Sequence, residues 1–287
     1  MSVPTDPDRN AGVPLGRRLL MATARSRLLP SYLVVGVKRA GTSTLQQVIA
    51  QHPAVLPPNV PKGTRYFDVN HGFGWDWFRS HFPSARRAAA RARRIGMPVV
   101  TGEASPYYLF HPLAPSRIRA VLPGVRLVVV LRDPVERAWS HHAYEVARGF
   151  EQLSFEAAID AEHERLLGEE ERLARDPTYV SRAHRHHSYL ARGRYDVQLA
   201  RLFSCFPPDD VLVLDHGELF ADPVAGVGRV QAFLGLPPVP PRRVPRLKPS
   251  GAPGMPATVR RRLAERFAAS NAATFALVGR EFAWSAP

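Results

Sequence analysis

Short, continuous apolar runs along the chain predict the strands of a buried sheet. Residues 32–37, 98–101, 125–131 and 211–214 are each largely apolar, without the alternation of apolar and polar positions that marks a half-exposed strand. Runs of this length and character are typical of parallel strands covered on both faces. Helical patterns separate them, so the order of elements predicts an α/β chain with right-handed crossovers.

Helical spacing of apolar residues fills the intervals between these runs. Together the two patterns predict a three-layer, P-loop-like α/β fold, in which a central parallel sheet is flanked by helices. The segments with helical spacing are residues 42–51, 84–95, 113–122, 134–149, 155–175, 188–206, 224–234 and 257–269.

The chain shows no internal repeat, and we expect residues 31–287 to form a single domain. Residues 1–30 contain scattered arginines and are expected to form a flexible basic arm. Residues 154–187 are rich in charges of both signs and predict an inserted helical cap, and residues 237–256 predict a proline-rich loop that crosses the sheet edge. Loops and caps at the carboxyl ends of the strands are where an open α/β sheet binds its ligand.

Composition narrows the class of protein. With 287 residues, 45% of them hydrophobic, the chain can bury a sizeable core. Cys205 is the single cysteine, which excludes an intrachain disulfide and a cysteine zinc cluster. We therefore expect a reducing, cytoplasmic location. The apolar runs are too short to span a bilayer, and the apolar piece among the N-terminal arginines is too short for a signal peptide.

A formal net charge of +14 favours an anionic ligand, which could be a nucleotide, a nucleic acid, a sulfated polymer or a membrane surface. Charge alone does not choose among these ligands. Among the 39 basic residues the lysines are few, namely Lys38, Lys62 and Lys248, and each lies in a loop that we expect to line one site.

The first motif with chemical content follows the first apolar run. Gly36 and Gly41 have the spacing of a nucleotide phosphate loop, but Thr42 stands where that loop has its lysine. The backbone N–H groups and the helix start, with the hydroxyls of Thr42, Ser43 and Thr44, can still hold an anion. Taken alone, the segment could equally be an ordinary glycine turn.

A second loop of the same kind follows residues 125–131. Asp133 suits the N-cap and Pro134 the first turn of a helix. Arg132 leaves the strand end and Ser140 lies about two helical turns further on, so both can reach one phosphate. The alternative is that Arg132 pairs locally with Asp133 or Glu136 and that Ser140 is a packed small residue.

The two loops, in this order, resemble the sulfotransferases that use 3′-phosphoadenylyl sulfate (PAPS), particularly their bacterial and heparan-modifying branches. The resemblance covers roughly residues 31–284 and depends on the shared order of several short pieces. These pieces are Lys62-Gly-Thr-Arg-Tyr-Phe67, Gly102-Glu-Ala-Ser-Pro-Tyr-Tyr108, Gly193-Arg-Tyr195 with Leu199, residues 211–214 with Glu218-Leu219, and Phe233-Leu-Gly-Leu-Pro237.

The resemblance implies an enzyme that transfers a sulfuryl group from PAPS to a hydroxyl or amine of a small-molecule or glycan acceptor, without a metal, and releases adenosine 3′,5′-bisphosphate. It also implies which residues bind PAPS. The first loop would bind the 5′-phosphosulfate, the second loop the 3′-phosphate, and the proline-rich loop would close over the nucleotide. These residues are Lys38, Arg39, Ala40, Gly41, Thr42, Ser43 and Thr44 in the first loop, Arg132 and Ser140 in the second, and Lys248, Ser250 and Gly251 in the third.

Two departures from the family pattern affect the chemistry. The first-loop lysine of the family corresponds to Arg39, whose guanidinium can stabilise charge on the leaving phosphate but is a poor proton donor. Lys38 and Lys62 remain possible replacements. The glutamate that serves as general base in the heparan branch corresponds to Gly63, so this carboxylate is absent.

Glu103 is the carboxylate that we predict as general base, because it matches an acidic residue of the family at a strand end. Its alternative role is to hold a turn or a hydroxyl. His71 and His111 are the next candidates, and with Lys62 and Tyr107 they are predicted to line the acceptor side.

Other readings of the chain remain. A small-molecule kinase is disfavoured by Thr42 in the phosphate loop. A polyanion-binding protein is suggested by the arginines of residues 86–94, although no stacking aromatic accompanies them. His184, His186 and His187 could suggest a metal site, but the neighbouring arginines favour a solvated basic face. The acceptor and the oligomeric state are not identified by the sequence.

Overall fold

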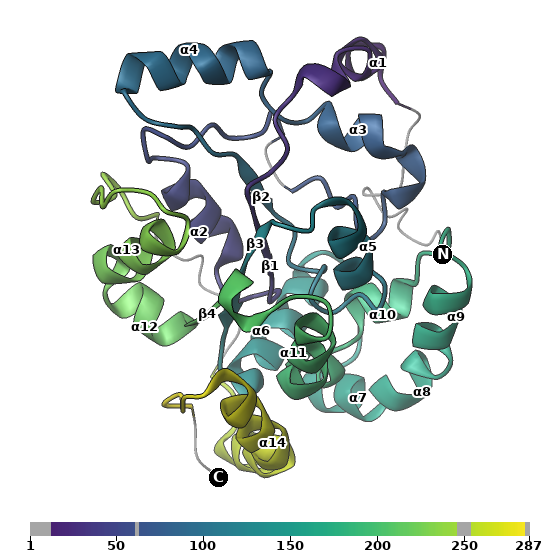
Figure 1. Cartoon of the computed structure of the whole chain (residues 1–287). Helices are drawn as coiled ribbons and strands as arrows, with labels where there is room; N and C mark the ends of the chain where they lie inside the picture. Colours follow the sequence, from purple (N-terminus) through teal and green to yellow (C-terminus); the bar gives the residue numbers. More distant parts are fainter. Residues whose placement is uncertain (1–12, 61–62, 246–253, 285–287) are drawn as a thin grey trace.

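The computed structural model describes residues 13–60, 63–245 and 254–284. Within them, four parallel strands form one sheet in the order β2-β1-β3-β4, flanked by helices (Figure 1). This is the predicted three-layer α/β architecture. The strands are β1 Tyr32–Gly36, β2 Gly102–Ala104, β3 Arg126–Leu131 and β4 Val211–Asp215.

The centre of the sheet explains the continuous apolar runs. All of β1, and every residue of β3 after Arg126, are buried, because helices cover both faces. The second strand lies later than the predicted residues 98–101, and Val100 forms only an isolated bridge with Val55. Pairing with β1 begins where Gly102 faces Tyr32. The two strands are so close at this point that a Cβ on Gly102 would overlap the Tyr32 carbonyl oxygen. A glycine is therefore needed at this close approach.

Most of the predicted helices are confirmed with small shifts at their ends, but the last one, predicted for residues 257–269, continues to Val278. One predicted helix, over residues 188–206, begins later than expected, so that residues 188–194 precede the helix α11. In this segment the carboxylate of Glu162 accepts hydrogen bonds from the backbone N–H groups of Leu190 and Ala191. The confirmed helices are α2 Thr42–Ile49, α4 Ala85–Ile95, α5 Ala114–Val121, α6 Pro134–Ala147, α11 Tyr195–Phe203, α13 Pro223–Phe233 and α14 Ala257–Val278. Short helices not predicted are α1 Leu15–Met21, α3 Trp75–Arg79 and α12 His216–Ala221.

The segment 154–187 forms several short helices along one side of the molecule (Figure 1). The long pattern predicted for residues 155–175 is interrupted at Leu167, which is not helical, and at Gly168, which has a φ of +73°. A left-handed residue at this point ends one helix and starts the next. The four helices are α7 Phe155–Asp160, α8 Glu162–Leu166, α9 Glu169–Arg175 and α10 Arg182–His186.

Residues 13–30, the described part of the predicted arm, pack against the domain. Arg17 Nη1 donates hydrogen bonds to the Ser80 carbonyl oxygen at 3.0 Å and to Asn59 Oδ1 at 3.1 Å. Arg27 Nη1 donates to the Phe82 carbonyl oxygen at 2.8 Å. The two arginines thus hold this segment against the end of α3 and the residues beside it.

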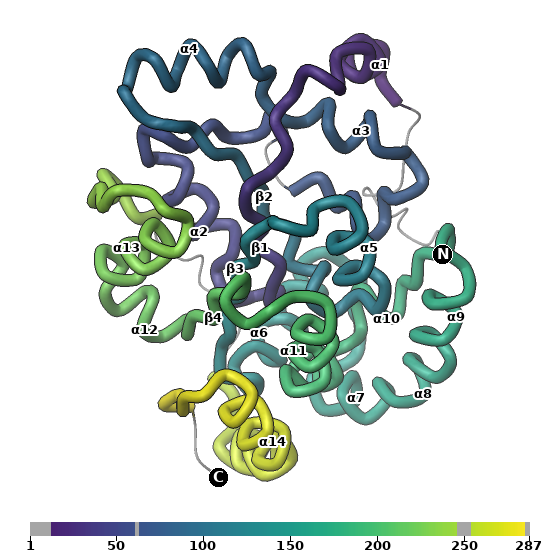
Figure 2. The backbone as a smooth tube through the Cα atoms, in the orientation of Figure 1, coloured from purple at the N-terminus to yellow at the C-terminus, as the bar shows by residue number. Residues whose placement is uncertain are grey.

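The tube in Figure 2 shows which elements lie at each end of the sheet. α1 and α4 lie at the amino ends of the strands, whereas α6, α12 and α14 lie toward the carboxyl ends. Open α/β sheets bind their ligands at the carboxyl ends of the strands, so the site is expected near α6, α12 and α14. Among the described residues, no helix combines the length and apolar character needed to cross a membrane.

Candidate active site

The first loop joins β1 to α2 and ends in a helix start suited to an anion. Gly41, with a φ of +83°, precedes α2, and its carbonyl oxygen accepts the Leu45 N–H at 2.9 Å. The N–H groups of a helical first turn have no partner inside the helix and can bind an anion. The Ser43 side chain is exposed and Thr44 is half-buried, whereas Thr42, predicted to contribute a hydroxyl, is buried.

The second loop joins β3 to α6 as the sequence predicts. The Asp133 carboxylate caps α6 by accepting the N–H groups of Val135 at 2.8 Å and Glu136 at 3.3 Å. Tyr195 of the Gly193-Arg-Tyr195 piece donates its hydroxyl to the Arg132 carbonyl oxygen at 2.7 Å. The turn that carries Arg132 is therefore fixed from two sides.

The two loops meet. Arg39 Nε donates to Ser140 Oγ at 3.1 Å, and Arg132 Nη1 donates to the Arg39 carbonyl oxygen at 3.2 Å. Arg132 also approaches Glu136 at 3.5 Å, so the local pairing considered for it is present as well. The structure thus brings together the cations and the hydroxyl that the sequence assigned to two phosphates.

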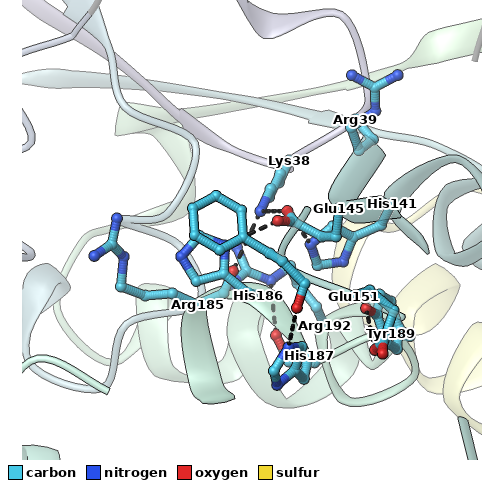
Figure 3. Close-up of polar contacts among 12 residues, drawn as sticks. Lys38, Arg39, His141, Glu145, Glu151, Arg185, His186, His187, Tyr189 and Arg192 are labelled. Carbon is cyan, nitrogen blue, oxygen red and sulfur yellow. Dashed lines mark hydrogen bonds and ion pairs between the residues drawn. The ribbon is translucent and has the colours of Figure 1, made fainter. Parts of the chain in front are cut away.

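Lys38 and Arg39 are neighbours in the chain but extend in different directions (Figure 3). Lys38 Nζ lies 2.5 Å from Glu145 Oε1 and donates to the Arg185 carbonyl oxygen at 3.2 Å. Burial lowers the pKa of Lys38 to about 7, although Glu145 acts in the opposite direction. The Arg39 guanidinium lies 4.8 Å from the ring centre of Tyr144, and Lys38 Nζ lies 5.6 Å from the same ring centre. Of the two, Arg39 faces the second loop.

Gly63 has no room for a side chain. A Cβ at this position would overlap the carbonyl oxygen of Ala104 and the hydroxyl of Ser105. The glutamate that the family resemblance places here could not be accommodated without moving β2.

Glu103, the predicted general base, is 1% exposed, and its carboxylate accepts three hydrogen bonds. Its donors are the Thr64 N–H, the Thr64 hydroxyl at 2.8 Å and the Tyr108 hydroxyl at 2.7 Å. Burial raises the pKa of Glu103 to about 7, while these donors act in the opposite direction. The carboxylate therefore ties the loop after Gly63 to the sheet.

The other predicted acceptor-side residues are buried to different extents. His71 is half-buried, and burial lowers its pKa. The buried Tyr107 hydroxyl lies 2.7 Å from His184 Nδ1. Burial, followed by the charge of Arg117, lowers the pKa of His111 to about 3. Lys62, Lys248, Ser250 and Gly251 lie outside the described residues.

Comparison with known proteins identifies the family. Residues 29–245 match the family model described as the sulfotransferase domain. This chain belongs to the sulfotransferase family.

Relatives and structures agree with this membership. The chain is 29% identical to human heparan sulfate glucosamine 3-O-sulfotransferase 3A1, over 79% of the chain and 49% of the relative. It is 28% identical to human heparan sulfate glucosamine 3-O-sulfotransferase 6, over 99% of this chain and 81% of that relative. The crystal structure of a sulfotransferase from Alicyclobacillus acidocaldarius superposes with a TM-score of 0.62 and 27% identity, over 89% of this chain and 98% of that one.

The first relatives are longer proteins. This sulfotransferase spans about half of 3-O-sulfotransferase 3A1, and 22% of the human bifunctional heparan sulfate N-deacetylase/N-sulfotransferase 2, to which it is 26% identical over 73% of the chain. The kinase reading of the first loop is set aside by the family assignment.

The histidines near α10 do not form the solvated basic face predicted for them. His184 and His186 are 3% and 2% exposed, and Arg185 between them is also buried. α10 is covered by the rings of Phe110, stacked on His184, and Phe150, stacked on His186. Within the described ranges, no group of three or more metal-ligating side chains suited to a metal ion is found.

Several residues of the site were not predicted from the sequence. Tyr144 lies under the Arg39 guanidinium, and Glu145 pairs with Lys38. His216, at the start of α12, has Nδ1 3.1 Å from the Ala40 carbonyl oxygen. These residues belong to no recognisable motif, and only their positions one helical turn beyond Ser140, or directly after β4, could have suggested them.

Proposed function

We propose that this sulfotransferase transfers the sulfuryl group of PAPS to a hydroxyl or amine of an acceptor. The observation that supports this most directly is the convergence of the two loops, through the contact of Arg39 with Ser140 and of Arg132 with Arg39. Two cations, a hydroxyl and the start of α2 at one place suit a nucleotide with separate 5′ and 3′ anionic groups.

The residues present fit PAPS in two respects. The half-buried Arg132 and the hydroxyl of Ser140 are the proposed 3′-phosphate ligands. Arg39 and the first turn of α2 are the proposed ligands of the 5′-phosphosulfate. When bound, PAPS supplies an activated sulfuryl group.

In the proposed reaction a bond forms between the acceptor atom and sulfur while the bond from sulfur to the bridging oxygen breaks. The acceptor proton goes to a base, and adenosine 3′,5′-bisphosphate leaves. Arg39 stabilises the negative charge that develops on the leaving phosphate, since a fixed cation acts more strongly there than water does.

Glu103 is our proposed base, with two observations that point in different directions. Its pKa of about 7 suits proton transfer near neutrality. Its burial and three hydrogen-bond donors suit the structural role considered for it. The turnover and the stability of a Glu103→Gln variant distinguish the two roles.

The direct test of the proposed function is turnover of PAPS labelled in its sulfuryl group. The protein should transfer the label to members of a panel of phenolic, alcoholic, amine and glycan acceptors, and form adenosine 3′,5′-bisphosphate in equal amount. Turnover of ATP with transfer of its γ-phosphate, and none of PAPS, would contradict the proposal.

We also propose a cytoplasmic location, supported by the single cysteine.

A further inference from the structure

Glu145 is the centre of a buried polar cluster beside the first loop (Figure 3). It lies in α6 five residues beyond Ser140, and its side chain is 0% exposed. Its carboxylate is approached from three elements. Lys38 Nζ of the first loop lies 2.5 Å from Oε1, His141 Nε2 of α6 lies 3.2 Å from Oε1, and His186 Nδ1 of α10 lies 2.8 Å from Oε2.

The charges of this cluster make Lys38 the natural partner of Glu145. Burial alone would raise the pKa of Glu145, but the two histidines and Lys38 bring it below its ordinary value. Burial lowers the pKa of both His141 and His186, which favours their neutral forms. An isolated buried carboxylate is costly, and Lys38 contacts it directly, while Arg192 and Arg39 also lie close enough for their charges to act with it.

This pairing determines where the first loop presents its positive charge. The Lys38 ammonium is turned to Glu145 and to the Arg185 carbonyl oxygen, away from the place where Arg39 contacts Ser140. Arg39 itself has a φ of +76°, a conformation that a residue with a side chain adopts only when its surroundings hold it. Lys38 directly precedes Arg39, so holding Lys38 in place also restricts the backbone of Arg39.

We infer that Glu145 is a positioning residue that anchors Lys38 and thereby directs Arg39, and not Lys38, toward the 5′-phosphosulfate. The inference rests on the proposed function and adds a role for a residue outside both phosphate-binding loops. It also separates the roles of the two adjacent cations: Lys38 holds the loop, and Arg39 contacts the anion.

The test measures how much the 5′-phosphate contributes to binding, as the ratio of the Kd of adenosine 3′-monophosphate to the Kd of adenosine 3′,5′-bisphosphate. Glu145→Gln and Lys38→Met should each lower this ratio ~2- to 30-fold, the range expected when a group acts through another. The double variant should lose no more than the larger single loss, because both changes break one contact.

The two possible roles of Lys38 predict opposite changes of the Kd ratio in Glu145→Gln. If Lys38 binds the 5′-phosphate directly, Glu145→Gln frees it and raises the ratio, while Lys38→Met lowers it. That pattern, or an unchanged ratio in Glu145→Gln, would overturn the inference. Removing both partners of a buried ion pair is often tolerated, so the double variant should fold. The loss of the 5′-phosphate's contribution to binding can then be measured in this variant.

A matched control is Glu151→Gln. Glu151 is another buried glutamate, bonded to Arg165 at 2.7 Å and to the Tyr189 hydroxyl at 2.9 Å, and none of these bonds involves the first loop. This variant should change the melting temperature and leave the ratio as in the wild type. If the wild-type protein does not bind adenosine 3′,5′-bisphosphate at all, the proposed function fails, whatever the variants do.

Discussion

At the scale of single residues, the site separates two adjacent cations. Lys38 is paired with a buried carboxylate, whereas Arg39 donates a hydrogen bond to Ser140. The sequence left open which of the two replaces the first-loop lysine of the family, because the choice depends on Glu145, which is 107 positions away from Lys38. No local pattern could indicate that pair.

The first prediction concerns Arg39. Arg39→Ala should lower kcat by ~100-fold or more, because it removes a cation placed where negative charge develops. Arg39→Lys should retain much of the wild-type rate, since it keeps the charge. The measurement is steady-state turnover of labelled PAPS. A larger loss in Lys38→Ala than in Arg39→Ala would reverse the two assignments.

The second prediction concerns Glu103 as general base. Glu103→Gln should lower kcat by at least ~100-fold while the affinity for adenosine 3′,5′-bisphosphate changes little. If instead the variant turns over normally, or only melts at lower temperature, Glu103 is the tie between the Thr64 loop and β2. His71 and His111 would then be tested by the same two measurements.

At the scale of elements, the close packing of the Gly63 loop on β2 is as important as any single side chain. Gly63 faces the Ala104 carbonyl oxygen, and Glu103 of the same strand accepts from Thr64. The continuous apolar runs predicted β1 and β3 well, because burial on both faces leaves a direct pattern in the sequence, and they also located β4, whose Leu212 and Val213 are half-buried. They misplaced β2, where a glycine allows the backbones to approach and the apolar residues just before it do not pair with β1.

The third prediction concerns Gly63. Gly63→Ala should destabilise the protein by ~1–3 kcal/mol, since the added methyl group overlaps the backbone of Ala104. Gly63→Glu should be less stable still and should not raise kcat. The melting temperature and the turnover of PAPS test both variants. A stable Gly63→Glu protein with higher kcat would show that the missing base can be restored at this position.

The fourth prediction uses the pH dependence of stability. The pKa of Glu103 is raised to about 7 in the folded protein from an ordinary value of 4.5, so the folded state holds this proton more tightly than the unfolded state does. The stabilisation linked to this proton is complete below about pH 4.5 and is lost as the pH rises through about 7. The difference in free energy of unfolding between the wild type and Glu103→Gln should therefore change across this interval in that direction. A constant difference from pH 4.5 to 7 would contradict it.

At the scale of the whole molecule, the fold explains why two short motifs far apart in the sequence form one site. Parallel strands in the order β2-β1-β3-β4 place the loops after β1 and β3 side by side at the carboxyl edge. This part of the site follows from the sequence, since each loop comes directly after a buried run. The surroundings contributed by α6, α10 and α12 do not, because Glu145 and His216 meet the first loop, and His186 meets Glu145, only through tertiary packing.

The measurement that tests the account most directly is the affinity of the protein for adenosine 3′,5′-bisphosphate compared with ADP, by titration calorimetry at fixed salt. The wild type should prefer the bisphosphate, because Arg132 and Ser140 are the proposed ligands of the 3′-phosphate. A charged hydrogen bond typically contributes about 1.5–3 kcal/mol, so Arg132→Ala should reduce the preference by roughly 10- to 160-fold. Equal affinities of the wild-type protein for the two nucleotides would contradict the assignment of the second loop, and with it the proposed use of PAPS.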